Sequence, residues 1–201
     1  MTLPGFHLLR GYLDRHGQSA LLGEVLELVG EAPFYRPVVP SGGRMSVAMT
    51  NFGSLGWVTD RSGYRYETNH PVTGRPWPAI PPRLLELWKA LGGERAPADA
   101  CLVNRYDAKA RMGLHRDADE ADFGFPVVSI SLGDAAVFRL GGLRRSDSTV
   151  RFDLASGDVC VLAGPARLAY HGVDRVLAGT SDLIAGGGRI NLTLRRAAAT
   201  L

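Results

Sequence analysis

Two segments of the chain carry apolar residues at the spacing of an α-helix. Within residues 18–29, apolar side chains recur three and four positions apart, which predicts a helix packed on a core. Its apolar face consists of Leu21, Leu22, Val25, Leu26 and Val29. A second helix is predicted within residues 81–93, where Pro81 and Pro82 suit a helix start and Gly92 with Gly93 a stop. Its buried side consists of Leu84, Leu87, Trp88 and Leu91.

From residue 100 onward the pattern changes to short runs rich in β-formers, separated by turns of Gly, Asp and Ser. About eight such runs at regular spacing predict an antiparallel sandwich or barrel. The runs are ACLVNRY (100–106), RMGLHRD (111–117), PVVSISLG (126–133), AVFRLGG (136–142), TVRFDL (149–154), DVCVLAG (158–164), RLAYHGV (167–173) and RINLTLR (189–195).

The middle of the chain, residues 33–82, is rich in Gly, Pro and aromatic residues and has little periodicity. We expect a long, ordered system of loops or hairpins there rather than core sheet, and such loops often carry function. The chain is therefore divided into an N-terminal extension, residues 1–99, and a sheet core, residues 100–201. Together they form one structural domain.

Composition agrees with a folded globular protein of one domain, since 45% of the 201 residues are apolar and 21% are charged. A net charge of +3 and a pI near 9.1 permit an anionic partner without requiring one. No apolar run has the roughly 18 residues that a membrane span needs, so we expect a cytoplasmic protein with no membrane partner. Cys101 and Cys160 lie in apolar runs and are expected to be buried free thiols.

The stretch GLHRDADE holds His115 and Asp117 one residue apart, and RLAYHGV supplies His171 in a later predicted strand. In a jelly roll these three could occupy one face of an octahedron, which is typical of non-haem iron(II) oxygenases. Alternatively, the first pair is an ordinary polar turn and His171 a hydrogen-bonded strand histidine. The remaining histidines show no comparable partners and are expected on the surface or in loops; they are His7, His16 and His70.

The run RINLTLR places four polar side chains on one face of a strand by period-two alternation, with Leu192 and Leu194 on the other. The polar face consists of Arg189, Asn191, Thr193 and Arg195. Inside a sandwich, two arginines and an amide are costly unless something anionic lies among them, and a dicarboxylate would serve. An exposed arginine edge strand is the alternative. Asn104 and Tyr106 add same-face polar groups on an earlier strand.

With NRY, HxD, YHG and R-x-N-x-T-x-R in this order, the sequence resembles the AlkB-type iron and 2-oxoglutarate-dependent dioxygenases, which repair alkylated nucleobases. The resemblance covers roughly residues 33–196, and the residues before it match poorly. Its other matching stretches are MSVAMTNFGSLGW, RPWPAIP, VVSISLG and the GGLRR turn. It implies a mainly β fold with flanking helices, built on a double-stranded β-helix (jelly roll) core with an N-terminal nucleotide-recognition lid.

The resemblance also implies the cofactors: Fe(II), 2-oxoglutarate as cosubstrate, and O2. Iron would be held by His115, Asp117 and His171. Arg189, assisted by Asn104 and Tyr106, would pair with the remote carboxylate of 2-oxoglutarate, because a guanidinium offers two parallel donors. Arg195 and Asn191 would act near the metal, either on the other carboxylate or on Asp117. These eight side chains are the predicted metal and cosubstrate site.

The implied substrate is an N-alkylated adenine or cytosine in DNA, whose demethylation releases formaldehyde as 2-oxoglutarate becomes succinate and carbon dioxide. Such a base must be single-stranded or flipped out of the duplex. Trp57 would stack on it opposite the imidazole of His115, although without the resemblance Trp57 would be taken as a core or loop-anchoring aromatic, as Trp77 and Trp88 are. The other implied substrate contacts are Tyr64, Asp119, Ser129 and Arg145.

The sequence departs from the family at two positions. Leu162 stands where bacterial members have a tryptophan, and Ala118 stands where they have a lysine. We expect these differences to affect the preference for single- or double-stranded nucleic acid and the range of lesions repaired. Two alternatives stay open: an RNA demethylase of the same chemistry, and a non-catalytic jelly-roll binding module. The protein is expected to be a monomer.

Overall fold

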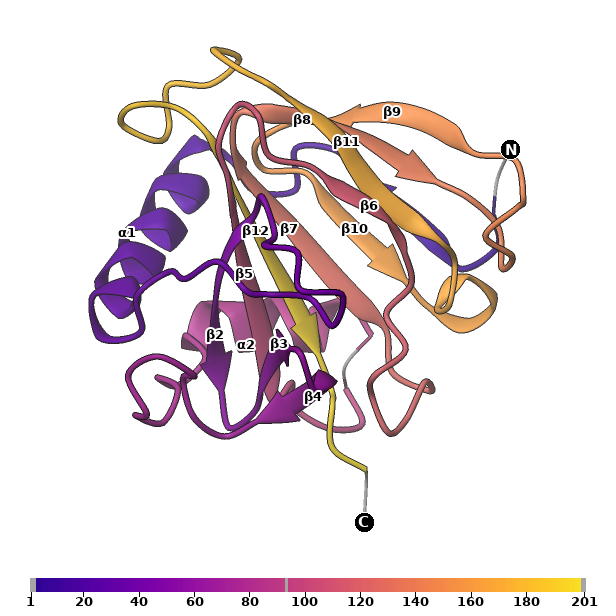
Figure 1. Cartoon of the computed structure of the whole chain (residues 1–201). Coiled ribbons are helices and arrows are strands. Elements are labelled where there is room, and N and C mark those ends of the chain that lie inside the picture. The colour runs from indigo at the N-terminus through magenta and orange to yellow at the C-terminus, as the bar shows by residue number, and fades with distance from the viewer. Residues whose placement is uncertain (1–2, 93, 200–201) are drawn as a thin grey trace.

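The computed structural model describes residues 3–92 and 94–199, and over these the protein consists of facing antiparallel sheets flanked by two α-helices (Figure 1). The larger sheet has the order β1-β10-β7-β12-β5-β2. Its strands are β1 (Phe6–Leu9), β2 (Ala48–Gly53), β5 (Ala100–Tyr106), β7 (Val127–Gly133), β10 (Val159–Leu162) and β12 (Arg189–Arg195). The smaller sheet has the order β6-β11-β8-β9 and consists of β6 (Met112–His115), β8 (Ala135–Leu140), β9 (Val150–Leu154) and β11 (His171–Leu177).

The two sheets confirm the predicted jelly roll, and the period-two alternation of their strands decides what lies between them. Along β12, Ile190, Leu192 and Leu194 point to the face of the larger sheet that packs on the helices. The four alternating polar residues of the same strand point the other way, toward the smaller sheet, and are buried there. The prediction of a polar face inside the sandwich is therefore confirmed.

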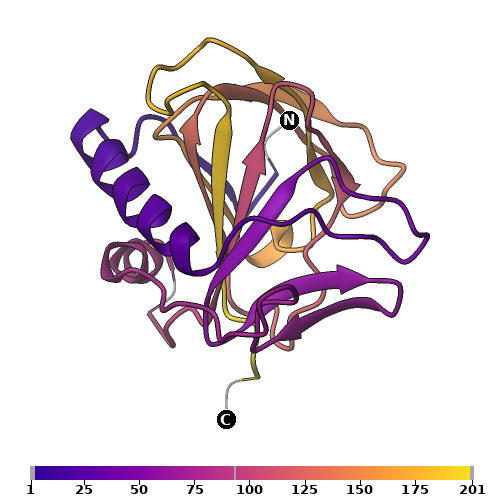
Figure 2. The same ribbon diagram turned by 60° about the vertical axis from the view of Figure 1, so that its left-hand side comes forward.

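Both predicted helices are present and pack on the apolar face of the larger sheet (Figure 2). The first is α1 (Arg15–Glu31), whose N-terminus is capped by the side chain of Asp14, and the second is α2 (Pro82–Ala90). One predicted core position is wrong, because Leu26 is 50% exposed. The face of α1 that is buried is narrower than the apolar face that the sequence predicts. Gly93, part of the predicted stop, lies outside the described residues.

The sequence pattern missed two strands of the larger sheet and overestimated one strand of the smaller sheet. Residues 33–82 do contain core sheet, since β2 pairs with β5 along its whole length, and β1 adds an edge strand beyond β10. The rest of this segment fits the prediction of loops and a hairpin, formed by β3 (Gly56–Asp60) and β4 (Gly63–Glu67). The run 167–173 is not one strand: a 3-10 helix, η1 (Gly164–Ala166), and a turn precede β11, which begins at His171.

Cys101 and Cys160 are buried free thiols, as expected, and burial raises the pKa of each to about 12. Within residues 3–92 and 94–199, no helix is both long and apolar enough to cross a membrane.

The end of β2 depends on a glycine that permits a close approach between strands. Gly53 has φ +120°, and an added Cβ would overlap the carbonyl oxygen of Asp99. We expect Gly53→Ala to lose about 1–3 kcal/mol through backbone strain and a further 1–3 kcal/mol, roughly, through overlap. Gly63 has a similar φ, +125°, but open space around it, so Gly63→Ala should show the strain alone. Urea unfolding measures both, and equal losses would contradict the steric argument.

Candidate active site

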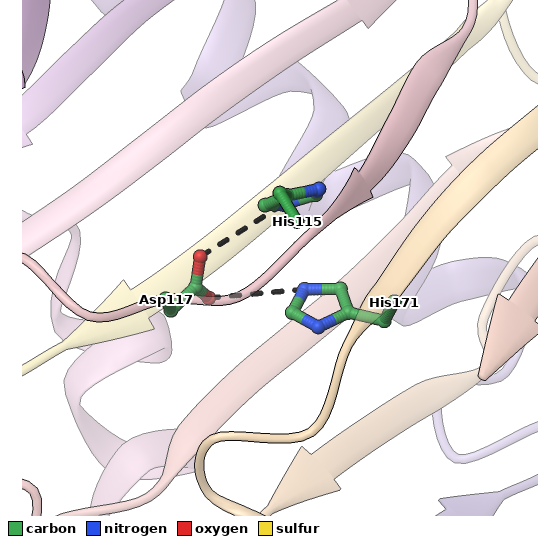
Figure 3. Close-up of side chains that lie close together, drawn as sticks. All are labelled: His115, Asp117 and His171. Carbon is green, nitrogen blue, oxygen red and sulfur yellow. Dashed lines mark ion pairs between the residues drawn. The ribbon is translucent and has the colours of Figure 1, made fainter. Parts of the chain in front are cut away.

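The pairing of β6 with β11 brings the two predicted histidine ligands together. His115, the last residue of β6, is the cross-strand partner of His171, the first residue of β11, and their ring centroids lie 4.5 Å apart. Asp117 lies two residues after the end of β6, and its carboxylate faces both imidazoles (Figure 3). Its Oδ1 lies 3.9 Å from Nε2 of His115, and its Oδ2 lies 3.9 Å from Nε2 of His171. One ligand atom from each of the three lies within 4.8 Å of the others, so this part of the prediction is confirmed as a site that could hold a metal ion.

Hydrogen bonds fix both imidazoles in the form that a metal ligand needs. Nδ1 of His115 lies 2.9 Å from the carbonyl of Gly113, and Nδ1 of His171 lies 2.9 Å from that of Ala169. Because a carbonyl only accepts, each Nδ1 carries the proton and each Nε2 presents its lone pair to the shared space. Burial lowers the pKa of His171 to about 4, with the neighbouring His115 as the second cause, so this imidazole is neutral at pH 7.

The carboxylate of Asp117 is held charged by a buried arginine. Burial alone would raise its pKa, but Arg195 and the two imidazoles outweigh that effect and lower it well below the usual range. Nη2 of Arg195 lies 3.0 Å from Oδ2 of Asp117, which matches one of the two roles predicted for this arginine. Two neutral nitrogens and one anionic oxygen on one side of an open space suit a divalent iron.

Around this ligand lies a buried cluster of two carboxylates and two guanidinium groups. Arg195 also contacts Glu120 (3.2 Å), and Arg167 lies 3.0 Å from the other oxygen of Glu120. Arg167 donates as well to the backbone carbonyl of Asp117 (2.8 Å). Tyr66, on β4, donates its hydroxyl to Glu120 at 2.8 Å. The loop that carries the metal ligand is thus fixed through both side chain and backbone.

Arg189 lies in the same cavity with most of its hydrogen-bonding capacity unused. It is 1% exposed, and only Nη2 has a partner, the hydroxyl of Ser131 at 2.8 Å. Its Nε and Nη1 are buried without a partner, as is Oδ1 of Asn104. A buried, unpaired guanidinium is costly, so the site is built for an anion absent from the protein itself. A carboxylate fits the two unpaired donors of Arg189.

The other predicted cosubstrate residues differ in whether their polar atoms are already hydrogen-bonded within the protein. Tyr106 is the cross-strand partner of Arg189 and is 3% exposed; burial raises its pKa to about 12, which keeps the hydroxyl protonated. The amide of Asn191 is already bonded to Ser129 and to the carbonyl of Ile130, and its oxygen accepts from Thr193. Asn191 therefore organises the cavity wall, and none of these bonds goes to Asp117.

At the mouth of the cavity, the hairpin supplies aromatic side chains. Trp57 and Tyr64 stack with their centroids 5.6 Å apart and an interplanar angle of 19°. The indole N–H of Trp57 donates to Asp119 at 2.7 Å. The structure thus brings these three predicted substrate residues together. By contrast, Arg145 is exposed on the loop after β8 and bonds to the carbonyl of Leu114, beside His115.

The cavity that joins these groups has a volume of about 320 Å³. Ser129 lies in its wall on the larger sheet, and Leu162 lines it from β10. Ala118 is half-buried in the loop after β6. The predicted residues that line the cavity are Trp57, Tyr64, Asn104, Tyr106, His115, Asp117, Asp119, Ser129, His171, Arg189, Asn191 and Arg195.

Sequence reasoning missed three members of the site: Glu120, Arg167 and Tyr66. Only Glu120 carried a usable signal, since a third acidic residue so soon after a predicted metal ligand calls for a cationic partner. Arg167 and Tyr66 lie far from it in the chain and gave none.

Comparisons with known proteins agree with this geometry. Residues 5–195 match the family model of the 2OG-Fe(II) oxygenase superfamily, so the match begins well before residue 33. A Caulobacter vibrioides relative named alpha-ketoglutarate-dependent dioxygenase AlkB homolog is 60% identical and covers 98% of this chain and 89% of its own. Escherichia coli alpha-ketoglutarate-dependent dioxygenase AlkB is 44% identical over 88% of this chain and 83% of its own.

Two further matches extend beyond bacterial AlkB. An Arabidopsis thaliana protein named DNA N(6)-methyladenine demethylase ALKBH1C is 32% identical over 96% of this chain, which spans 48% of that relative. The solved structure titled "The structure of OsALKBH1" superposes with a TM-score of 0.83 at 32% identity and covers 98% of each chain. The fold and the site are therefore those of an oxygenase with iron, 2-oxoglutarate and oxygen as its cofactors.

We expect Asp117→Ala to lose metal binding while keeping the fold. The variant removes the only anionic ligand, so affinity should fall by more than the roughly 10–100-fold that follows loss of an outer partner. Arg195 keeps Glu120 as a counter-charge, so circular dichroism should be unchanged. Anaerobic titration with Fe(II) or with Mn(II) measures the loss. Parent-like affinity would show that the three side chains are not the ligand set.

Arg189→Ala should weaken 2-oxoglutarate binding by at least about 2 kcal/mol, roughly 30-fold, because a charge-assisted pair is lost in a buried site. Arg189→Lys retains the charge without the two parallel donors and should lie between the variant and the parent. Calorimetric titration with 2-oxoglutarate in the presence of Mn(II) tests this, with Mn(II) affinity as the control. A matching loss of Mn(II) affinity would contradict a role specific to the cosubstrate.

Proposed function

Because the chain belongs to the 2OG-Fe(II) oxygenase superfamily, we propose that it removes N-alkyl groups from adenine and cytosine bases in DNA by oxidation. The observation that carries the proposal is the placement of Trp57, Tyr64 and Asp119 at the mouth of the cavity that holds the metal ligands. The names of the relatives agree with it, since one is a DNA N(6)-methyladenine demethylase. Family membership also removes the alternative of a non-catalytic binding module.

The mouth of the cavity suits a flat, cationic ring. Tyr64 stacks on one face of the Trp57 indole, and a nucleobase would stack on the other face or displace Tyr64. Alkylation at a ring nitrogen gives adenine or cytosine a positive charge, which the exposed carboxylate of Asp119 and the aromatic faces would both favour over the undamaged base. We assign Trp57, Tyr64 and Asp119 to substrate recognition, with Ser129 and Arg145 as further contacts.

Deeper in the cavity, we assign Arg189, Asn104 and Tyr106 to the remote carboxylate of 2-oxoglutarate. The unpaired donors of Arg189 are the main support for this assignment. Asn191 holds the wall through Ser129, and Arg195 holds Asp117 in its charged form. His115, Asp117 and His171 are the iron ligands.

When bound, iron and 2-oxoglutarate with O2 supply the oxidation of the alkyl carbon, which leaves as an aldehyde, with succinate and carbon dioxide as the other products. The protein positions that carbon beside the ligand set and shields it from water. The walls of the cavity do so with apolar side chains from both sheets, among them Leu102, Phe138, Leu162 and Val173.

A base in a duplex cannot reach a cavity of this depth, so the substrate would be single-stranded or would flip its base out of the stack. We propose that the β3–β4 hairpin acts as the nucleotide-recognition lid of residues 1–99, over the catalytic core of residues 100–201. The enzyme would act as a monomer in the cytoplasm.

The proposal is tested by measuring formaldehyde and succinate with Fe(II) and 2-oxoglutarate on an oligonucleotide that carries one N1-methyladenine or N3-methylcytosine. Above the background of substrate-independent succinate formation, both products should rise by equal amounts with the methylated DNA, and neither should rise with the unmethylated strand. A matched methylated RNA strand compares the two polymers, because the 2′-hydroxyl is the main difference between them. No formaldehyde from any methylated strand would overturn the proposal.

Trp57→Ala should lower kcat/KM for the methylated strand by roughly 10- to 100-fold, since stacking of a base on an aromatic contributes about 1–3 kcal/mol. Substrate-independent succinate formation should persist, because the metal and cosubstrate residues lie on the strands and loops of the core. Trp57→Phe keeps a stacking face without the bond to Asp119 and separates the two contributions. If background succinate formation is lost along with demethylation, Trp57 supports the core and is not a recognition residue.

A further inference from the structure

The hairpin touches the loop of the metal ligand at two consecutive carboxylates. Trp57 and Tyr66 are cross-strand partners on β3 and β4 and therefore point to the same face of the hairpin. Trp57 donates to Asp119 and Tyr66 to Glu120, the second and third residues after Asp117. The two contacts differ in exposure, because Asp119 is exposed whereas Glu120 is 6% exposed.

Glu120 is a junction between the hairpin and the metal ligand. Its Oε1 accepts the Tyr66 hydroxyl at 2.8 Å and lies 3.2 Å from Nε of Arg195. The same guanidinium places Nη2 3.0 Å from Oδ2 of Asp117. Three contacts thus join the phenol of the hairpin to the oxygen that faces His171. Asp117, Glu120 and Arg195 are buried and Tyr66 is half-buried, so these contacts are poorly screened by water and correspondingly strong.

We infer that Tyr66 is a positioning residue that couples docking of the β3–β4 hairpin to the iron ligand Asp117 through Glu120 and Arg195. The inference rests on the proposed function in that it treats the hairpin as the lid over the base. When the hairpin is docked, Tyr66 satisfies part of the Glu120 charge, and Arg195 is shared between two fixed carboxylates. Without the phenol, Glu120 competes more strongly for Arg195, and the orientation of Asp117 is less well defined.

Such coupling must act in both directions. If a docked hairpin strengthens metal binding, then bound metal must stabilise the docked hairpin by the same free energy. This reciprocity separates a coupling residue from a simple anchor. An anchor would hold the hairpin equally well with and without metal.

The test compares hydrogen–deuterium exchange of residues 56–67 with and without Mn(II), a redox-stable substitute for Fe(II), in the parent and in Tyr66→Phe. In the parent, Mn(II) should slow exchange of the hairpin amides by threefold or more. In Tyr66→Phe that protection should disappear, and the dissociation constant for Mn(II) should rise by threefold or more. Tyr35→Phe is the matched control: it removes a buried phenol hydroxyl without a partner, beneath the same hairpin, and should behave as the parent.

Two outcomes overturn the inference. One is faster hairpin exchange in Tyr66→Phe with unchanged Mn(II) affinity, which would make Tyr66 an anchor only. The other is a parent in which Mn(II) does not protect the hairpin. Because no nucleic acid enters these measurements, a failure here is distinguishable from a failure of the demethylation assay.

Discussion

The buried contact between Arg195 and Asp117 is the interaction on which the site depends. The loop between β6 and β7 carries four carboxylates, of Asp117, Asp119, Glu120 and Asp122, and two of them, Asp117 and Glu120, are buried. Without a counter-charge these groups would repel one another and remain in water. Arg195 from β12 and Arg167 from the turn before β11 neutralise the buried pair and draw the loop onto the sheet. Removing Arg195 would leave the buried charge of Asp117 without its cationic partner, and a loss of this kind typically costs about 3–5 kcal/mol.

The pattern of short β-rich runs predicted an antiparallel sandwich or barrel, and the resemblance to a known family narrowed this to a jelly roll. The face of β12 was predictable because its residues alternate between the apolar side of the sheet and the side that lines the cavity. The same reasoning failed for β2. Its Thr50 and Asn51 are fully buried, with their polar atoms bonded to the carbonyl of Ala32 and to the backbone of Trp57. Buried polar residues that serve neighbouring loops break the periodicity, so this strand looked like a loop. β1 has only four residues, too few for a pattern.

The site residues that lie close together in the sequence were predictable, and those that meet only in the folded structure were not. His115 and Asp117 lie two residues apart, and Arg189 and Arg195 lie on one strand, so spacing made them candidates and the resemblance to a known family assigned their roles. The start of β11 at His171 was not predictable from β-propensity, because Gly164 and Pro165 favour the 3-10 turn that precedes it. Glu120, Arg167 and Tyr66 meet only in three dimensions. Pairwise contacts between distant elements, such as Tyr66 with Glu120, leave no trace in the sequence of either one.

The position of β12 in the larger sheet has a consequence for how the protein is made. β12 is the last strand in the chain, yet it lies between β7 and β5. One side of the sheet consists of β1, β10 and β7, and the other consists of β5 and β2. During translation, no strand joins these two sides by hydrogen bonds until residues 189–195 leave the ribosome. The nascent chain therefore holds two half-sheets with open edges, which are prone to pair with other chains. Completing them requires contacts that are distant in sequence, which makes folding slow.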